Sequence, residues 1–164
     1  MRLEQQGLVG WREWIMFPTF DACLVKAKVD TGARTSAIHA LDPELKQIDG
    51  RDHVAFHIQP DQHDESRRVS CVAPLVERRA ITDSGGHTQE RFVVRVTIEL
   101  GAHAWPIELS LSDRDTMGFR MLLGRTAVRH RFLVAPGRSY LAGRSMAAVV
   151  DEATAKRAAR SGVS

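Results

Sequence analysis

The stretch that decides the fold occupies residues 26–36 and reads Lys26-Ala27-Lys28-Val29-Asp30-Thr31-Gly32-Ala33-Arg34-Thr35-Ser36. Its first half alternates apolar and basic residues, which predicts a β-strand with one buried face. The strand runs directly into Asp30, so we expect its carboxylate to be held rigidly at a strand end. Thr31 can brace the turn by hydrogen bonding, and Gly32 permits a sharp turn or the close approach of a second backbone.

A second apolar strand ends in glycine much later in the chain. It reads Met121-Leu122-Leu123-Gly124-Arg125 and leads into a segment at 124–130 that could form one or two turns of helix. An isolated Asp-Thr-Gly is usually an ordinary turn. The same tripeptide followed by hairpins and then by an apolar-apolar-Gly strand is a far more specific pattern.

The rest of the chain is dominated by a period of two. Alternation is clearest at residues 92–100 and 105–111, on either side of a loop at Gly101, and it predicts a β-hairpin. Further predicted strands lie at 8–16, 36–40, 53–59, 67–73, 76–82, 120–123, 131–135 and 139–142. Many short strands with frequent turns predict an all-β sandwich or barrel that is closed, because open sheet edges invite aggregation.

The length of 164 residues favours one domain, at residues 1–143, followed by a C-terminal tail at 144–164. In the tail, the spacing of Met146, Val149, Val150 and Ala153 predicts a short amphipathic helix that frays toward the end.

The composition excludes several classes of partner. The formal net charge is only +3 and no nucleic-acid-binding motif occurs, so we expect no nucleic-acid partner. No apolar run is long enough to cross a bilayer and no signal-peptide pattern is present, so we expect a cytoplasmic protein without a membrane partner. Cys23 and Cys71 are then expected to be reduced, small buried residues.

The two motifs together resemble the retropepsin-type aspartic peptidases. Over residues 8–142 the chain is similar to a bacterial family often labelled putative ATP-dependent zinc protease, whose members are associated with RimK-type glutamate ligases. The closest matches are Gly10-Trp11-Arg12-Glu13, the stretch at 26–36, Ser84-Gly85-Gly86, and Arg114-Asp115-Thr116-Met117 through Met121-Leu122-Leu123-Gly124-Arg125. The resemblance implies a closed acid-protease barrel with one short helix after Leu-Leu-Gly-Arg.

The resemblance also implies a homodimer, because the chain carries a single Asp-Thr-Gly and a second copy would supply the other carboxylate. Two adjacent carboxylates share one proton, so one Asp30 would act as general base toward water while the other polarises the scissile carbonyl. The implied catalytic residues are Asp30, Thr31 and Gly32, and the implied substrate contacts are Ala33, Arg34, Leu123, Gly124 and Arg125. The expected substrate is a peptide or a glutamate-modified protein.

One departure from the retroviral members concerns Arg34, which stands where they carry an acid that pairs with the arginine after the second motif. Arg125 must therefore find another partner or face solvent, and both arginines would suit an acidic substrate. A mobile flap is also expected over the cleft. The loop at 59–66 is slightly favoured for it over the glycine-containing loop at 83–89.

No cofactor or metal site is expected. The chain has no His-Glu-x-x-His, no Cys-x-x-Cys and no glycine-rich phosphate loop ending in Lys-Ser/Thr. Two alternatives stay open. One is a zinc-dependent hydrolase that uses His53, His57 and His63, with Asp61, Asp64 and Glu65 close by. The other is a non-enzymatic peptide-binding barrel in which Asp30 is a structural remnant.

Overall fold

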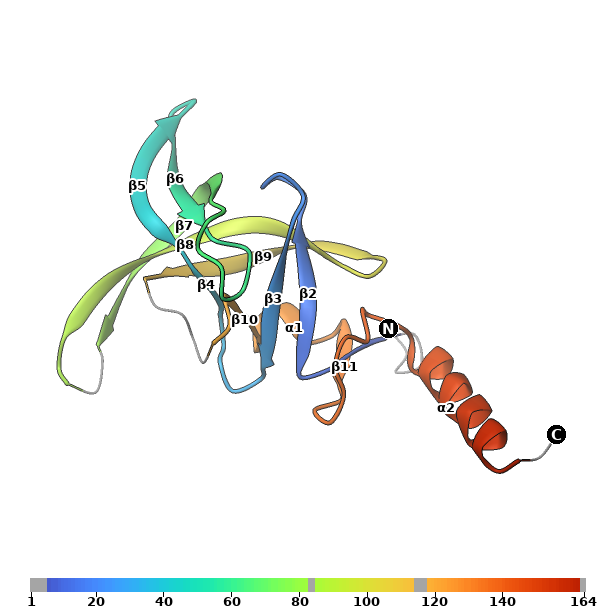
Figure 1. Ribbon diagram of the computed structural model, residues 1–164. Coiled ribbons are helices and arrows are strands. Elements are labelled where there is room, and N and C mark those ends of the chain that lie inside the picture. The colour runs from blue at the N-terminus through green and yellow to red at the C-terminus, as the bar shows by residue number, and fades with distance from the viewer. Residues whose placement is uncertain (1–5, 83–84, 114–117, 163–164) are drawn as a thin grey trace.

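The computed structural model describes residues 6–82, 85–113 and 118–162 (Figure 1), so Ser84 and residues 114–117 of the matching motifs lie outside the described residues. The strands are β1 (Gly7–Val9), β2 (Arg12–Phe17), β3 (Cys23–Asp30), β4 (Ser36–His39), β5 (Leu41–Ile48), β6 (Arg51–Ile58), β7 (Val69–Thr82), β8 (Thr88–Leu100), β9 (His103–Ser112), β10 (Met121–Gly124) and β11 (Phe132–Val134). The helices are α1 (Arg125–Val128) and α2 (Met146–Arg160).

Six strands close into a barrel in the order β2-β3-β10-β4-β9-β8. The barrel closes where β8 returns to β2, with Met16 opposite Glu99. β7, β6 and β5 continue the sheet outward from β8 as an arm, whose β5–β6 turn stands at the top of Figure 1. The predicted all-β barrel is therefore confirmed, together with the short helix α1 directly after Gly124.

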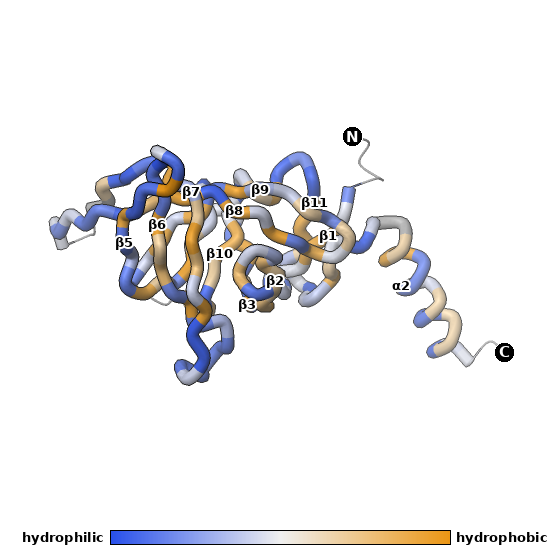
Figure 2. The backbone as a smooth tube through the Cα atoms, turned by 90° about the horizontal axis from the view of Figure 1, so that it is seen from above, coloured by the Kyte–Doolittle hydropathy of each residue, from blue (hydrophilic) through white to orange (hydrophobic). Residues whose placement is uncertain are grey.

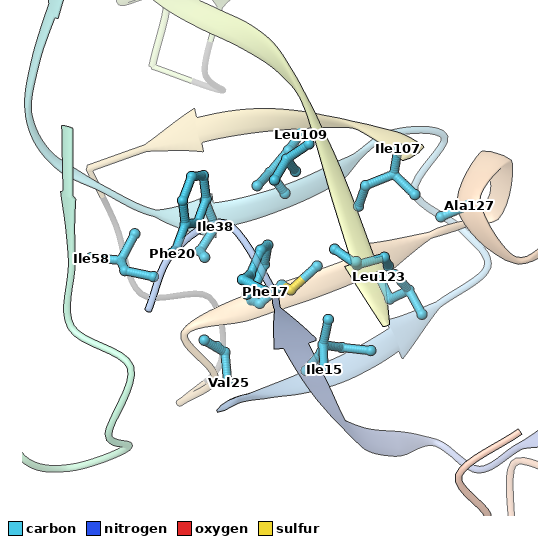
Figure 3. Close-up of a cluster of buried hydrophobic side chains, with 14 of the residues drawn as sticks. Ile15, Phe17, Phe20, Val25, Ile38, Ile58, Ile107, Leu109, Leu123 and Ala127 are labelled. Carbon is cyan, nitrogen blue, oxygen red and sulfur yellow. The ribbon is translucent and has the colours of Figure 1, made fainter. Parts of the chain in front are cut away.

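The core fills the barrel with the inward faces of the alternating strands. In β3, Val25, Ala27 and Val29 are buried, whereas Lys26 and Lys28 are only half-buried. Side chains from several strands point toward one another in the barrel interior (Figure 3), among them Ile15, Phe17, Val25, Ile38, Leu109 and Leu123. Burying one such side chain contributes about 1.5–3 kcal/mol, so the period of two is what drives these strands to close around a common core.

β5 is a strand that the apolar periodicity does not predict. Residues 42–48 are exposed, the strand contains Pro43, and it is mostly hydrophilic at the rim of the molecule (Figure 2). An edge strand needs no buried face and tolerates proline, so pattern alone cannot reveal it. Asp49 and Gly50, both with positive φ, form the tight turn that pairs it with β6.

The predicted strands at 67–73 and 76–82 form one continuous strand, β7. The irregularity between them is a register shift between Leu75 and Glu77 against β8, not a turn. A bulge of this kind bends a strand without ending it. The long β7–β8 hairpin that results carries residues 78–80 toward the end of the barrel at which β3 stops.

The predicted strand at 139–142 is wrong. Tyr140 and Ala142 have φ of 56° and 53°, which no strand adopts. The cause is the buried carboxylate of Glu13, which accepts hydrogen bonds from the amides of Leu141 (2.8 Å), Ala142 (2.9 Å) and Gly10 (2.7 Å). These three donors fold the backbone around the carboxylate instead of leaving it extended.

The helix predicted in the tail is present as α2. Ser145 caps it by accepting a hydrogen bond from the amide of Ala148 at 3.2 Å. Val149 is buried against Leu8 and Leu141, but Val150, which the spacing places on the apolar face, is 55% exposed. From this contact the helix runs away from the barrel (Figure 1). The domain boundary at residue 143 stays a prediction.

Candidate active site

Asp30 stands at the end of β3, directly beside the end of β10. The two strands are parallel, with Leu123 opposite Val29 and Gly124 opposite Asp30. The following residues, 31–35, connect β3 to β4 and lie at the bottom of the barrel in Figure 1. We call residues 30–35 the Asp30 loop. The two motifs that the sequence singles out are therefore brought together by strand pairing.

The Asp30 carboxylate is held by backbone. The Oδ1 of Asp30 accepts a hydrogen bond from the amide of Gly32 at 3.0 Å. The backbone carbonyl of Asp30 accepts a second one from the amide of Ala33 at 3.3 Å. Thr31 is exposed, so within one chain the carboxylate is braced by the Gly32 amide and not by the threonine. Apart from Asp30 Oδ1 and the two chain neighbours, no atom of the described residues lies within 4 Å of the Cβ position of Gly32, which leaves this side of the loop open to a second molecule.

Gly124 is required by close packing against the Asp30 loop. A Cβ there would lie 2.6 Å from the carbonyl carbon of Thr35, which real structures do not allow. Its amide donates to the Oγ of Ser36 at 2.9 Å in a buried position. Leu123, predicted to contact substrate, is fully buried and points into the barrel (Figure 3), so that expectation is wrong. Gly124 itself acts on the site through backbone contact with the loop.

Arg125 finds its partner in the loop backbone. Its Nη1 donates to the carbonyl of Thr31 at 3.1 Å, and its amide donates to the carbonyl of Ala33 at 2.7 Å. Thr126 adds two hydrogen bonds to the carbonyl of Arg34, from its amide (3.1 Å) and its hydroxyl (2.8 Å). The first amides of α1, which a helix cannot satisfy internally, thus clamp the Asp30 loop.

A groove of about 340 Å³ opens beside the loop, between α1 and β9. Among the described residues that line it are three arginines, Arg34, Arg79 and Arg129, and one carboxylate, Glu108. Arg79 donates from Nη1 to the hydroxyl of Thr35 at 3.3 Å and also pairs with Glu77. We call this groove the loop groove. Its arginine excess favours anionic ligands.

Lysines share the outward face of β3 with Asp30. Side chains alternate along a strand, so Lys26 and Lys28 project on the same side as the carboxylate. Arg12 lies opposite Lys28 on β2 and adds a third cation to this face. These residues are absent from the predicted site, although the period of two that begins at Asp30 already places the lysines there.

The comparisons with known proteins agree with this geometry. A family model described as the retropepsin-like aspartic endopeptidase RimB matches residues 8–145. The chain belongs to the RimB-like family. α2 lies entirely outside the region that the family model covers.

RimB-like sequence also occurs within larger relatives. The chain is 39% identical to a probable alpha-L-glutamate ligase of Desulfotalea psychrophila, in a match that covers 94% of the chain and 33% of the relative. For the proteins of the same name from Shewanella halifaxensis and Parasynechococcus marenigrum, the identities are 38% and 40%, with 91% and 83% of the chain and 32% and 29% of the relative covered. The RimB-like chain thus spans about a third of the length of these curated relatives.

A solved structure shares the fold. A Legionella pneumophila protein of unknown function superposes with a TM-score of 0.69 at 22% identity, over 82% of the chain and 96% of that protein. At this identity the likeness establishes the RimB-like barrel and nothing about its chemistry.

The slightly favoured flap at 59–66 lies beside the start of β10 in the RimB-like barrel, whereas Asp30 lies beside the end of that strand. Gln62 donates to the carbonyl of Gly118, and Arg120 donates to the carbonyl of Asp61 at 3.4 Å, so this loop sits where β10 begins. The alternative at 83–89 ends the β7–β8 hairpin, which Arg79 ties to the Asp30 loop. Residues 83 and 84 are outside the described part of the chain, and the flap is better sought at residues 85–89 than at 59–66, against the slight preference drawn from the sequence.

The histidines form no metal centre in the described ranges. His53 and His57 share one face of β6, and His63 lies in the loop beyond it. No group of three or more His, Cys, Asp or Glu side chains that could hold a metal ion is found among the described residues. The zinc alternative therefore has no ligand set in the described part of the RimB-like chain.

The two thiols are buried and unpaired with each other. Burial raises the pKa of Cys23 and of Cys71, with the stronger effect on Cys71. A thiol that resists ionisation is a poor nucleophile, which supports their predicted role as small core residues.

Neither described helix combines the length and apolar character needed to cross a bilayer.

Proposed function

We propose that the chain is an aspartic endopeptidase or amidase that works as a homodimer and hydrolyses peptide-like bonds. The observation that carries the proposal is the Asp30 carboxylate, fixed by the Gly32 amide at 3.0 Å on a loop whose outer side is open. One carboxylate per chain is half of the required pair, and a two-fold axis beside Thr31 and Gly32 supplies the other half.

In the proposed dimer the two Asp30 carboxylates share one proton, because two adjacent negative charges repel each other. The ionised carboxylate takes a proton from a water molecule, which attacks the scissile carbonyl. The protonated carboxylate donates to the carbonyl oxygen and stabilises the charge that develops there. Arg125 and the first turn of α1 act as positioning groups, since they hold the loop and do not touch the reacting atoms.

We further propose a substrate rich in glutamate. The loop groove has three arginines to one glutamate, and Lys28 lies one pleat from Asp30 on the same face. Carboxylates are the groups that arginine forks bind best in peptides. The relatives named as glutamate ligases favour the same substrate, although the chain spans only about a third of their length.

The test is cleavage of a synthetic oligoglutamate peptide, followed by mass spectrometry, with the wild-type chain and with Asp30→Asn. The matched control is Asp52→Asn, which changes an exposed acid on the arm. We expect cleavage by wild type and control and none by Asp30→Asn. Equal cleavage by Asp30→Asn would refute the mechanism.

The dimer is tested separately by mixing. Adding an equal amount of Asp30→Asn chain to wild type, under conditions that let subunits exchange, should lower activity per wild-type chain to about half, since random pairing places half of those chains in mixed dimers. Activity that stays constant on mixing would mean that each chain works alone. A folded, monomeric and inactive chain would instead favour the peptide-binding barrel.

A further inference from the structure

A second cationic groove lies between α2 and the segment that follows β11. It is lined by Arg138, Glu152, Lys156, Arg157 and Arg160 and has a volume of about 340 Å³. We call it the tail groove. All its α2 residues lie outside the region matched by the RimB-like family model, so nothing known of the family assigns a role to it.

The groove follows from the way α2 leaves the barrel. Val149 packs against Leu8 and Leu141 at the first turn. Glu152, Lys156 and Arg160 follow at intervals of three or four residues and so continue the same helix face. An apolar residue on this face would keep the helix packed against the barrel, but the face instead presents charged side chains toward Arg138. The groove begins where the apolar contact of Val149 ends and the charged residues follow.

The charges in the groove are unbalanced. Among the described residues that line it, Glu152 is the one carboxylate. Glu152 already pairs with Lys156 at 3.0 Å and with Arg144 at 2.5 Å, and these two cations lower its pKa. Among the described residues, no acid pairs with Arg138, Arg157 or Arg160. Like charges that face one another across a groove are unfavourable, and a bound anion relieves that repulsion.

The tail groove is connected to β3, the strand that ends at Asp30, by two backbone hydrogen bonds. The amide of Trp11 donates to the carbonyl of Arg138 at 2.8 Å, and the amide of Val29 donates to the carbonyl of Trp11, also at 2.8 Å. Val29 directly precedes Asp30. An anionic chain held at Arg138 therefore lies on the side of the barrel where β3 ends.

The lining favours a carboxylate-rich polypeptide over a nucleic acid. None of the described residues that line the groove is aromatic, and stacking on aromatic rings is a main source of affinity for single strands. Lys156 and Arg160 are one helical turn apart, about 6 Å along the axis. Alternate residues of an extended peptide are spaced by about 6.6–6.8 Å, so successive same-side carboxylates can meet successive cations.

We propose that the tail groove is an exosite that binds an acidic segment of the polypeptide substrate, outside the cleft that contains Asp30. The identity of the ligand as substrate rests on the proposed function, whereas the binding itself does not. The site would raise the local concentration of a long acidic chain at the Asp30 loop without taking part in the chemistry.

The experiment measures binding of a fluorescein-labelled oligoglutamate peptide by anisotropy, with the full chain carrying Asp30→Asn so that no cleavage occurs. In this background we compare the double variant Arg157→Gln, Arg160→Gln with Arg51→Gln, Arg68→Gln, which removes the same charge from the arm. Circular dichroism confirms that each variant is folded. A third variant, Arg157→Lys, Arg160→Lys, keeps the charge.

We expect the groove variant to bind at least about fivefold more weakly, with a shallower dependence on NaCl concentration, and both other variants to bind nearly as the parent does. Equal weakening by groove and arm variants, or none by the groove variant, would overturn the exosite. Tighter binding of oligouridine than of oligoglutamate, lost in the groove variant, would overturn the acidic polypeptide as ligand. Anisotropy reports binding and not turnover, and mass spectrometry of the recovered peptide checks that it is intact, so these outcomes are independent of whether Asp30 catalyses hydrolysis.

Discussion

Arg125 donates a hydrogen bond from its guanidinium to the carbonyl oxygen of Thr31 at 3.1 Å, so the residue after the second glycine motif holds the loop that begins at Asp30. In the retroviral pattern the corresponding arginine pairs with an acid that this chain replaces with Arg34. The backbone carbonyl takes over as partner. The clamp on the loop is thus kept even though the ion pair is absent.

Arg125→Ala should lower the kcat/KM of the proposed peptidase much more than it lowers stability. The variant loses one exposed hydrogen bond, from the Arg125 guanidinium to the Thr31 carbonyl, which costs about 1 kcal/mol or less in the free energy of unfolding. The loop, however, loses the group that positions it. Urea denaturation and oligoglutamate cleavage measure the two effects. Arg51→Ala, which removes an exposed arginine from the arm, is the control, and equal activity of both variants would show that the clamp is irrelevant.

Gly124→Ala should destabilise the fold by about 1–3 kcal/mol, the usual cost of overpacking a tight contact. The new Cβ would meet the carbonyl carbon of Thr35 at 2.6 Å, which is backbone and cannot swing away. Gly137→Ala is the matched control, because no atom lies within 4 Å of its Cβ position. Thermal unfolding compares the two, and similar melting temperatures would contradict the packing of β10 against the Asp30 loop.

Glu13→Gln should destabilise the fold by about 1–3 kcal/mol, because the amide nitrogen would face a backbone donor and leave it unsatisfied in a buried site. The carboxylate is 1% exposed and accepts three backbone hydrogen bonds. Glu44→Gln, on the exposed edge strand, should change nothing measurable. Hydrogen exchange of the amides of Leu141 and Ala142 should accelerate in Glu13→Gln. Unchanged protection of these amides would argue against their hydrogen bonds to the Glu13 carboxylate.

Arg67→Gln should raise the pKa of Asp61 toward its ordinary value. The guanidinium donates to both carboxylate oxygens, at 2.8 and 2.9 Å, and this contact lowers the pKa in the folded protein. A pKa that is lower in the folded than in the unfolded state stabilises the protein at pH values above the unfolded-state pKa. That stability is lost as the pH falls through the folded-state pKa. The effect on stability is small, because the pair is exposed. An NMR titration of Asp61 measures the shift, and an unchanged pKa in the variant would disprove the pairing.

Much of the architecture is readable from local pattern. The alternation before Asp30 and the apolar-apolar-Gly motif before Arg125 locate the two strands that meet at the site. The short helix after Gly124 and the tail helix are likewise found where the pattern places them. β5 escapes detection because an exposed edge strand with a proline carries no apolar period.

The facing of β10 is not readable, because all four of its residues are buried. A strand that is covered on both sides shows no alternation of apolar and polar residues, so the sequence does not tell which face of β10 carries Leu123. Its register against Val29 decides the matter and turns Leu123 inward. Arg79 joins the loop groove only because the β7–β8 hairpin is long and paired as it is.

The backbone of most strands and of both helices follows from the amino-acid sequence alone, since strand period, turn chemistry and glycine conformation act between near neighbours. Only the tertiary structure decided what lies beside Asp30, because its neighbours Gly124, Arg125 and Arg79 come from remote parts of the chain. Such contacts are selected by packing inside a closed barrel, where one register buries every inward side chain and a slip by one residue would expose them all.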